Sequence, residues 1–501
     1  MSATFTIGQP AWVSSLPTEE DRWIPAPTLE IKGAPVAEFA EAYQLALRVM
    51  EYNLHQGMLE AGQGYGTWTR DSSINSWNAA SLLIPEIAKR TLWHEVDFTP
   101  DGPLIGGQYW DKVIWILAAL HYVQVTGDQP FLKSAYDVSL RTLAAMRSTE
   151  YDARTGLFRG PAVYGDGEAA YPAPPFNDEH GDNVFDYSQA ADMEVLSTNS
   201  VYYGAYRAAA VMGRKLGAAP QETDDLDKKA ANLRDAIQHI LWMPNLDRFA
   251  YLRDGEGRID STQEALGEAF AILLGVGSEQ QSNAIVRHAS ATRWGIACTW
   301  PPYPRYRDPT NQNFGRHNGT IWPFINAFWA TAAASVGESS VFAKEFLDAT
   351  QLALRSGDFR EMYHPYTGEP YGGVQAGLLW DSVRHQTWSA TGYVRMVHEV
   401  LLGMHFEDGG IRLQPTIPAS LGLRSITLQG VHYRQAVLNI TITGAGRRIL
   451  QCKLDGAAQP EAFIPATLAG KHDVEVVLSS IQPAPSRSSI AKTPVGKSVI
   501  H

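Results

Sequence analysis

Apolar residues recur at helical spacing through most of the chain up to Gly403, and this pattern limits the fold more than any other feature. The stretches with this spacing are residues 36–59, 112–126, 131–146, 198–216, 223–241, 264–274, 322–335, 341–355 and 389–403. Beyond Gly403, apolar and polar residues alternate with a period of two, which predicts strands over 411–414, 425–428, 436–442 and 474–478. The sequence therefore predicts a mainly α protein with a small C-terminal antiparallel β domain.

The 501 residues divide into four segments by pattern and composition. We expect an N-terminal extension over 1–35, a helical domain over 36–405, a β domain over 406–482 and a flexible tail over 483–501. A chain of this length is too long for one compact core and suits a large domain joined to a smaller one.

The formal net charge is -12, and no basic stripe or run of Lys and Arg is present. This balance argues against nucleic-acid partners, because nothing in the sequence would neutralise a phosphate backbone. No apolar run approaches the ~20 residues that a membrane-spanning helix needs, so we expect no membrane partner. Residues 1–17 lack the basic and apolar segments of a signal peptide, and we expect a cytoplasmic protein. The sequence does not indicate an oligomeric state.

The chain has two cysteines, Cys298 and Cys452, which lie far apart in the sequence. They do not have the close spacing of a zinc site. We therefore expect two unpaired thiols in a reducing compartment and no metal.

Long segments rich in Gly, Pro and aromatic residues separate the helical stretches. They are residues 98–110, 160–185, 299–318 and 358–384. Loops longer than about 12–15 residues are usually functional or disordered. Disordered segments avoid Trp, Tyr and Phe, so we interpret these loops as ordered walls of a binding site.

Glu361 stands among aromatic and polar neighbours, with Tyr363 two residues on and Trp388 further downstream. A general base must hold a water in line with a reacting carbon, which requires an ionised carboxylate among fixed hydrogen-bond donors. The alternative is a surface glutamate in a turn that ends at Gly368. The aromatic neighbours favour a catalytic Glu361 in a sugar-binding pocket.

Two further segments offer groups that suit a sugar. Arg70 and Asp71 combine guanidinium donors with a carboxylate acceptor, which suits two adjacent hydroxyls, and Trp68 offers a ring face for stacking. Their structural alternative is an ion pair at a helix start, with Asp71 as the N-cap. Asn318 and Trp322 open the helix predicted over 322–335, where their structural alternative is a cap and core packing before a first-turn proline.

A general acid must come from another carboxyl group in the middle loops. The candidates are Asp178, Glu179, Asp182, Asp186, Asp192 and Glu194. The residues by themselves do not choose among them.

Taken together, these segments resemble the six-hairpin (α/α)6-barrel glycosidases, especially glycoside hydrolase family 63 and the glycogen-debranching and glucoamylase-like enzymes. Residues 361–368 with 388–390 are similar to that group's "E-x-Y-x-P-x-T-G … W-S-A" block, residues 318–323 to its "N-G-x-x-W-P" helix start, and residues 68–71 to its "W-x-R-D" element. Residues 126–128 are similar to a recurrent turn between helices.

The resemblance implies an (α/α)6 toroid with a C-terminal β-sandwich, and Glu361 as the general base. It also implies that Arg70 and Asp71 grip hydroxyls of the terminal sugar. By its position before the helix over 198–216, Asp186 corresponds to the acid, although the usual "G-W-D" lead-in is absent and Asp182 is the second candidate. The implied activity is inverting hydrolysis of a terminal α-linked sugar, with glucose as the first choice and mannose or rhamnose left open, without metal or organic cofactor.

Three alternatives remain at this point. A disaccharide phosphorylase of the same fold would use phosphate in place of water, and Glu361 argues against it. A polysaccharide lyase would use Tyr363 or His364 as its base, but lyases act on uronates and the sequence shows little cationic clustering. A sugar-binding protein without catalysis would not need the carboxylate of Glu361.

Overall fold

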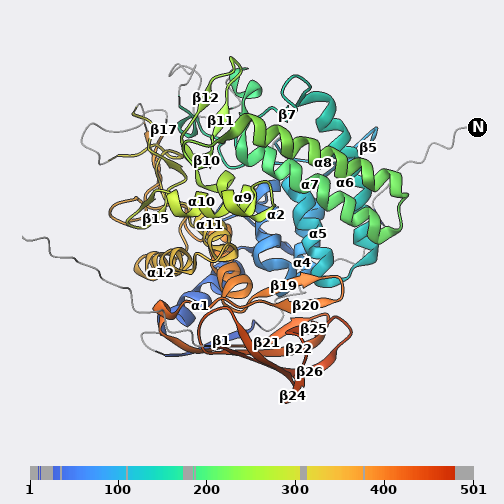
Figure 1. The fold of residues 1–501 in the computed structure, drawn as a ribbon, viewed down its shortest axis with the longest axis vertical. Helices are drawn as coiled ribbons and strands as arrows, with labels where there is room; N and C mark the ends of the chain where they lie inside the picture. The colour runs from blue at the N-terminus through green and yellow to red at the C-terminus, as the bar shows by residue number, and fades with distance from the viewer. Residues whose placement is uncertain are drawn as a thin grey trace, which may run out of the picture.

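In a computed structural model, a helical body stands above a module of strands (Figure 1). The structure describes Pro10, Trp12 and residues 26–33, 37–108, 111–172, 184, 188–304, 313–375 and 378–479. The prediction of a mainly helical protein with strands toward the C-terminus is confirmed at this level. Among the helices of the described residues, none is long and apolar enough to cross a bilayer.

The helices follow the predicted stretches closely. They are α1 (Ala37–Tyr52), α2 (Thr69–Asn75), α3 (Ser81–Leu83), α4 (Pro85–His94), α5 (Ile114–Thr126), α6 (Gln129–Thr149), α7 (Leu196–Leu216), α8 (Pro220–Leu241), α9 (Ala265–Leu273), α10 (Glu279–His288), α11 (Pro323–Ser335), α12 (Ser339–Ser356) and α13 (Thr387–Arg395). The π-helical turns η2 (Ser76–Ala80) and η7 (Met396–Leu401) continue α2 and α13. Periodicity missed α4 and α10, which are only ten residues long.

The helices succeed one another in space as well as in sequence. Helix α2 packs against α5, α5 against α7, α7 against α9, α9 against α11, α11 against α13, and α13 against α2. Helices α5 and α11 are buried over most of their lengths, whereas α8 and α12 bury one side. The former therefore lie at the centre of the helical body and the latter at its surface.

The turn between α5 and α6 shows how the sequence sets a helix boundary. Gly127 ends α5 in the left-handed region at φ 75°. Asp128 then caps α6, because its Oδ1 accepts a 2.9 Å hydrogen bond from the backbone N–H of Phe131. This is the inter-helix turn that residues 126–128 predicted.

Short hairpins extend from the ends of the helices. Their strands are β2 (Leu54–His55), β3 (Met58–Leu59), β4 (Val96–Thr99), β5 (Gly102–Ile105), β6 (Tyr151–Asp152), β7 (Leu157–Phe158), β8 (Glu194–Val195), β9 (Trp242–Met243), β10 (Arg248–Phe249), β11 (Leu252–Arg253), β12 (Ile259–Asp260), β13 (Gln263–Glu264), β14 (Ala291–Thr292), β15 (Gly295–Ile296), β16 (Thr299–Trp300), β17 (Val374–Gln375) and β18 (Leu378–Leu379). Several of them contribute walls to the cavities described below.

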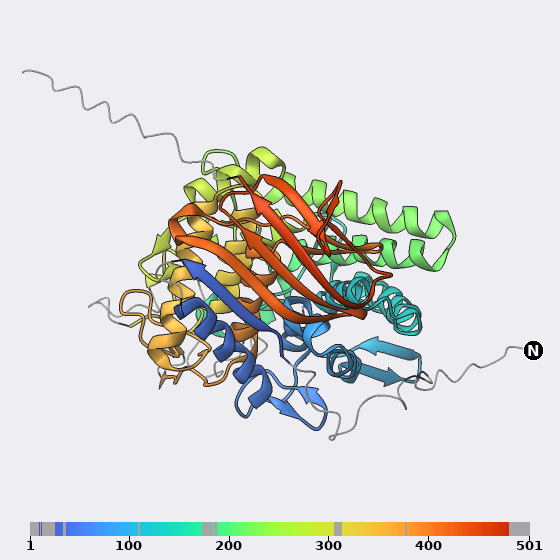
Figure 2. The same cartoon turned by 90° about the horizontal axis from the view of Figure 1, so that it is seen from below.

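The C-terminal module contains two sheets. Its strands are β19 (Met404–Glu407), β20 (Gly410–Leu413), β21 (Leu423–Tyr433), β22 (Gln435–Thr443), β23 (Ile449–Leu454), β24 (Ala457–Gln459), β25 (Phe463–Pro465) and β26 (Ala469–Leu478). The three-stranded sheet has the order β19-β20-β25, and the six-stranded sheet has the order β1-β21-β22-β26-β23-β24. Its first strand, β1 (Thr28–Gly33), comes from the N-terminal extension and lies at one edge (Figure 2).

The expectation of a purely antiparallel module is wrong at one pair, because β22 and β26 run parallel. The chain makes β23, β24 and β25 between them, and this long excursion lets β26 return in the direction of β22. The sheet is joined to the helical body by Arg434, whose guanidinium donates to the carbonyls of Gln124 and Val125 at the end of α5. Cys298 and Cys452 are buried and unpaired.

Candidate active site

Two distant segments meet through their backbones. The N–H of Ile321 donates to the carbonyl of Tyr363 at 3.0 Å, and the N–H of Tyr363 donates to the carbonyl of Ile321 at 2.9 Å. The chain reaches this bridge through Gly319 at φ 85°, where a Cβ would lie 2.8 Å from the ring of Phe314. A glycine is therefore required at this position. The bridge places Glu361 on the same cavity as Trp322, the N-cap residue of α11.

That cavity has a volume of about 270 Å³. It is lined by Tyr65, Trp68, Arg70, Asp71, Gln108, Tyr164, Asp166, Arg316, Trp322, Glu361, Gln375, Gln386 and Trp388. The lining includes first-turn residues of α2 and α13 and the residue before α11, so the N-terminal ends of three helices converge on it.

Most of the residues singled out from the sequence meet at this cavity. They are Trp68, Arg70, Asp71, Trp322, Glu361 and Trp388. Asn318 and Tyr363 are not among the lining residues. Asn318 exchanges hydrogen bonds of 2.6 and 3.1 Å with the backbone of Tyr303, and the Tyr363 hydroxyl lies 3.1 Å from Ser356 Oγ. Both side chains thus hold loops in place. Asp186 and Asp182 lie outside the described residues.

Asp71 is not the N-cap of α2, because Trp68 occupies that position and Asp71 lies in the first turn. Its carboxylate faces the cavity instead. Trp68 is 52% exposed, and its indole N–H donates to the carbonyl of Tyr65 at 2.9 Å. The ring therefore stands at the cavity mouth with its polar edge already bonded.

Arg70 is shared by three carboxylates. Its Nη2 lies 3.4 Å from Asp166 Oδ2, its Nη1 3.5 Å from Asp111 Oδ1, and its Nε 4.0 Å from Asp71 Oδ2. Nη1 also donates to the carbonyl of Val163 at 2.9 Å. One guanidinium cannot neutralise three acids, so their protonation must be unequal.

The pKa values of the three acids separate accordingly. Burial raises the pKa of Asp71 to about 7 and that of Asp111 to about 8, even though Arg70 opposes the shift. Burial would also raise the pKa of Asp166, but Arg70 and the nearby His317, with Nε2 at 3.2 Å, hold it below the ordinary range. With the cavity free, the negative charge therefore favours Asp166, and Asp71 and Asp111 bind protons more readily than ordinary aspartates.

Glu361 is held by a second arginine. Arg316 Nη2 donates to Glu361 Oε1 at 2.8 Å, and the Tyr65 hydroxyl approaches the same oxygen at 3.4 Å. The guanidinium carbon lies 5.7 Å from the ring centroid of Trp322 and 5.6 Å from that of Trp380. The other oxygen, Oε2, is buried without a partner. An acceptor of this kind can orient a water molecule.

Several other lining atoms are buried without a hydrogen-bond partner. They are Arg70 Nε, Gln108 Oε1, Gln375 Oε1, both amide atoms of Gln386 and Trp388 Nε1. Buried polar groups in folded proteins are nearly always paired, and each unpaired group costs about 1–3 kcal/mol. A sugar, with a hydroxyl on most ring carbons, would supply the missing donors and acceptors. The stacked pair of Trp388 and Phe324, 4.0 Å between centroids, fixes one of these groups in place.

Sequence reasoning missed six lining residues that matter to this description: Tyr65, Gln108, Asp166, Arg316, Gln375 and Gln386. Asp166 lies between Gly165 and Gly167 in the loop over 160–185, where it has the sequence of a simple turn. An acidic residue between two glycines, in a loop already interpreted as a site wall, was the available signal. The two arginine–carboxylate pairs join residues far apart in the sequence, and local pattern does not reveal them.

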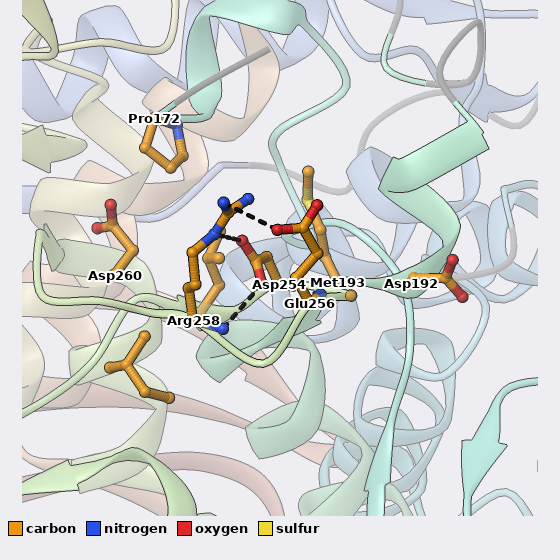
Figure 3. A pocket seen from close by; sticks show the side chains of 10 residues that line it. Pro172, Asp192, Met193, Asp254, Glu256, Arg258 and Asp260 are labelled. Atoms are coloured by element: carbon orange, nitrogen blue, oxygen red, sulfur yellow. Dashed lines mark hydrogen bonds and ion pairs between the residues drawn. The ribbon is translucent and has the colours of Figure 1, made fainter. Parts of the chain in front are cut away.

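A second, larger cavity of about 500 Å³ lies by β11 and β12 (Figure 3). Four acidic residues line it, but its arginine is satisfied within its own turn. Arg258 Nε lies 2.7 Å from Asp254 Oδ2, and Nη1 lies 2.9 Å from Glu256 Oε2. Both Arg258 and Glu256 have side chains that are 70% exposed. These charges are solvated, so the smaller cavity is the candidate active site.

A helical fold whose cavity holds two arginine-bound carboxylates is consistent with a glycoside hydrolase domain. The family model of the mannosylglycerate hydrolase MGH1-like glycoside hydrolase domain matches residues 110–389, and the chain belongs to this family. The match includes Asp166, Arg316 and Glu361 but begins after Arg70 and Asp71. No curated protein matches the chain.

Solved structures share the fold at low sequence identity. A sialidase superposes with a TM-score of 0.66 over 87% of this chain, and a GH78 rhamnosidase of a Bacillus species with 0.59 over 92%, both at 16% identity. The chain spans 40% and 44% of the lengths of these two proteins. A GH63 mannosylglycerate hydrolase from Thermus thermophilus superposes with 0.52 over 71% of this chain and 99% of its own, also at 16% identity. Likeness at this level shows the fold and leaves the substrate open.

Proposed function

We propose that the chain is an inverting, exo-acting glycoside hydrolase that removes a terminal α-linked sugar from a small oligosaccharide or glycoconjugate. Glucose is our first choice for that sugar, and mannose or rhamnose are the alternatives. The observation that carries the proposal is the cavity of about 270 Å³, in which Glu361 and Asp166 lie among indole rings and unpartnered buried polar atoms. A pocket of this size suits one sugar ring at the end of a substrate.

The same proposal includes the (α/α)6 toroid. The succession of contacts from α2 through α5, α7, α9, α11 and α13 back to α2 supports a closed inner ring of six helices. In such a ring the N-terminal ends of α2, α11 and α13 meet at one mouth, where the cavity lies. Residues that are distant in sequence then converge on one substrate.

Glu361 is the proposed general base. Arg316 keeps one of its oxygens in place, and the free oxygen Oε2 would take a proton from water as the water attacks the anomeric carbon. In an inverting enzyme the acid stands about 6.5–9.5 Å away on the other face of the sugar, which leaves room for that water.

Asp166 is the proposed general acid within the described residues, and Asp186 remains the proposal from the sequence. The Asp166 side chain is 38% exposed toward the cavity, whereas that of Asp71 is 6% exposed. Asp166 is ionised while the cavity is free, so it must gain a proton when the sugar binds. Asp71 lines the same cavity and, with a pKa of about 7, is partly protonated near neutral pH, and the three acids around Arg70 share their protons as one coupled group.

The arrangement supports hydrolysis over the alternatives. A phosphorylase needs a cation to hold phosphate, but Arg70 and Arg316 are both engaged by carboxylates and backbone carbonyls. A lyase with Tyr363 as base would need its hydroxyl in the cavity, and that hydroxyl lies against Ser356.

The test is proton NMR of the purified protein acting on α- and β-linked glucosides, mannosides and rhamnosides. Early appearance of the β-anomer from an α-glucoside is the expected result. Early α-anomer would overturn the inverting mechanism, and no turnover of any glycoside would overturn the proposal.

The acid is identified by comparing Asp166→Asn with Asp186→Asn on two kinds of substrate. Loss of the acid should slow an alkyl glycoside about 10²–10⁴-fold but spare a glycosyl fluoride, because fluoride leaves without a proton. If only Asp186→Asn shows this pattern, the acid is Asp186 and Asp166 serves to position Arg70.

A further inference from the structure

A small apolar hairpin stands beside the candidate active site. Strands β17 and β18 pair Val374 with Leu379 and Gln375 with Leu378. Leu378 is 65% exposed, Leu379 is 64% exposed and the following Trp380 is 42% exposed. Leu378 and Leu379 are successive residues of β18, so their side chains point to opposite faces of the hairpin, and each exposes apolar area that water solvates poorly.

The hairpin touches the loops that carry both proposed reacting groups. A Cβ at Gly167 would lie only 1.9 Å from Gln375 Oε1, so the loop that contains Asp166 lies directly against Gln375, which itself lines the cavity. At the other end of the hairpin, Trp380 covers Arg316, the partner of Glu361. The apolar residues therefore continue the cavity wall outward from the acid side.

A second apolar segment converges on the same place. Tyr65 is 38% exposed with its hydroxyl 3.4 Å from Glu361, and Trp68 is 52% exposed at the mouth. Among the described residues, twelve large hydrophobic side chains are exposed, and five of them belong to residues 65–68 and 378–380. Exposed apolar side chains that gather in this way mark a binding surface.

The charged residues of the cavity lining also favour an uncharged leaving group. The family model takes its name from mannosylglycerate, whose leaving group carries a carboxylate, and one related structure holds D-glycerate. In the part of this cavity that the structure describes, the terminal nitrogens of the two arginines are already engaged: those of Arg70 by Asp166 and Val163, and those of Arg316 by Glu361 and Gly372. Arg70 Nε has no hydrogen-bond partner, but it lies 4.0 Å from the carboxylate of Asp71. A carboxylate leaving group would meet Asp166 instead and be repelled.

We propose that residues 378–380, with Tyr65 and Trp68, form the leaving-group subsite, and that this subsite takes a neutral aglycone with an apolar face, such as an aryl or alkyl alcohol. The inference rests on the proposed glycoside hydrolase activity and names the substrate class of that same site. The sugar ring occupies the polar cavity, and the aglycone lies on the hairpin as it leaves Asp166.

The first experiment compares kcat/KM for four glycosides that share one sugar and differ in the leaving group. The four leaving groups are methanol, benzyl alcohol, octanol and glycerate. Benzyl and methyl alcohols are similar in basicity as leaving groups, so their difference reports binding of the aglycone. We expect benzyl and octyl glycosides to be preferred over the methyl glycoside about tenfold or more, with the glycerate glycoside the poorest. A preference for glycerate, or equal rates for benzyl and methyl, overturns the inference while the hydrolase stands. No hydrolysis of any of the four overturns the hydrolase as well.

The second experiment uses the double variant Leu378→Ser/Leu379→Ser, with Leu450→Ser as the matched control. Leu450 lies in β23 of the C-terminal module and is 59% exposed, like the two hairpin leucines. The double variant should lower the benzyl-to-methyl ratio of kcat/KM about tenfold, equivalent to about 1.4 kcal/mol, mainly through KM. The ratio should be unchanged in the control. An unchanged ratio in a folded double variant would show that something other than the aglycone covers these leucines and would reject the subsite.

Discussion

The cavity around Glu361 and the cavity by β12 differ in how their charged and polar side chains are satisfied. The cavity of about 500 Å³ by β12 is larger, but its Arg258 is paired with Asp254 and Glu256 within one exposed turn. The cavity of about 270 Å³ around Glu361 is smaller, yet its lining keeps buried polar atoms without partners. Unsatisfied burial, and not volume or acidity, therefore distinguishes the site for a ligand.

The reason is energetic. A solvated ion pair contributes about 0–1 kcal/mol and can form anywhere on a surface. An unpartnered buried group costs about 1–3 kcal/mol, and seven such atoms belong to the lining of the cavity around Glu361, where a bound sugar would pair with them. The comparison predicts that changes in the smaller cavity alter activity strongly and that the same changes in the larger one do not.

The largest effect is expected from Glu361→Gln. The amide keeps the shape of the side chain but cannot accept a proton from water, so kcat should fall about 10²–10⁴-fold. The measurement is steady-state hydrolysis of the glycoside on which the unchanged protein is most active, with circular dichroism to show that the variant is folded. Glu256→Gln, the same change in the larger cavity, is the matched control and should keep full activity. Equal loss in both variants would remove the distinction between the cavities.

Gln386→Leu should have the next largest effect. Neither amide atom of Gln386 has a partner in the free protein, so both are available to sugar hydroxyls. Their loss should lower kcat/KM about 10–100-fold, while the free energy of unfolding stays equal or rises because a buried unpaired amide is removed. The control is Gln351→Leu on the exposed side of α12. A destabilised variant with normal kcat/KM would assign the amide a structural role.

The third prediction concerns pH and Asp71. Burial raises the pKa of Asp71 from its ordinary value of 3.8 to about 7, so the folded state holds the proton more tightly than the unfolded state. The contribution of this group to stability is present below pH 4 and is lost as pH rises through 7. Asp71→Asn should therefore reduce the loss of unfolding free energy between pH 4 and pH 8, by roughly 4 kcal/mol for a pKa that is raised from 3.8 to about 7.

Denaturant unfolding at the two pH values measures this difference. Asp254→Asn in the larger cavity is the control, because the pKa of Asp254 is shifted in the opposite direction to that of Asp71. Partial burial would raise the pKa of Asp254, but its hydrogen bonds with Arg258 lower that pKa below the ordinary value. This variant should not change how the free energy of unfolding varies between pH 4 and pH 8. If both variants changed the pH dependence of the unfolding free energy by the same amount, Asp71 would be titrating as an exposed group does.

Much of the helical body could be predicted because its information is local. The apolar spacing over 112–126 and 198–216 needs only neighbours within two turns, and α5 and α7 lie at these positions. β1 was missed because six residues of an N-terminal segment gain their role only from pairing with β21, almost 400 residues away. The parallel pairing of β22 with β26 was not predicted for the same reason, because strand direction depends on the intervening strands.

The residues of the candidate site show the same difference between local and long-range information. Glu361 and Arg70 were predicted because each stands in a compact motif of residue types that suit a sugar. Asp166 was missed because its partner Arg70 lies 96 residues earlier, and no pattern within its own loop reports that contact. Asn318 shows the converse, because its motif is recognisable while its side chain serves the backbone of Tyr303.

The smallest effect is expected from Arg258→Ala in the larger cavity. The side chain is 70% exposed and its partners Asp254 and Glu256 remain hydrated when it is removed, so the free energy of unfolding should change by no more than about 0.5 kcal/mol. The rate of glycoside hydrolysis should also stay within error of the unchanged protein. Denaturant unfolding and steady-state kinetics on the same preparation measure both. A fall in kcat/KM of more than about threefold, or roughly 0.65 kcal/mol, would contradict this prediction. It would indicate that the larger cavity contacts the substrate, because an exposed turn affects the reaction only by such contact.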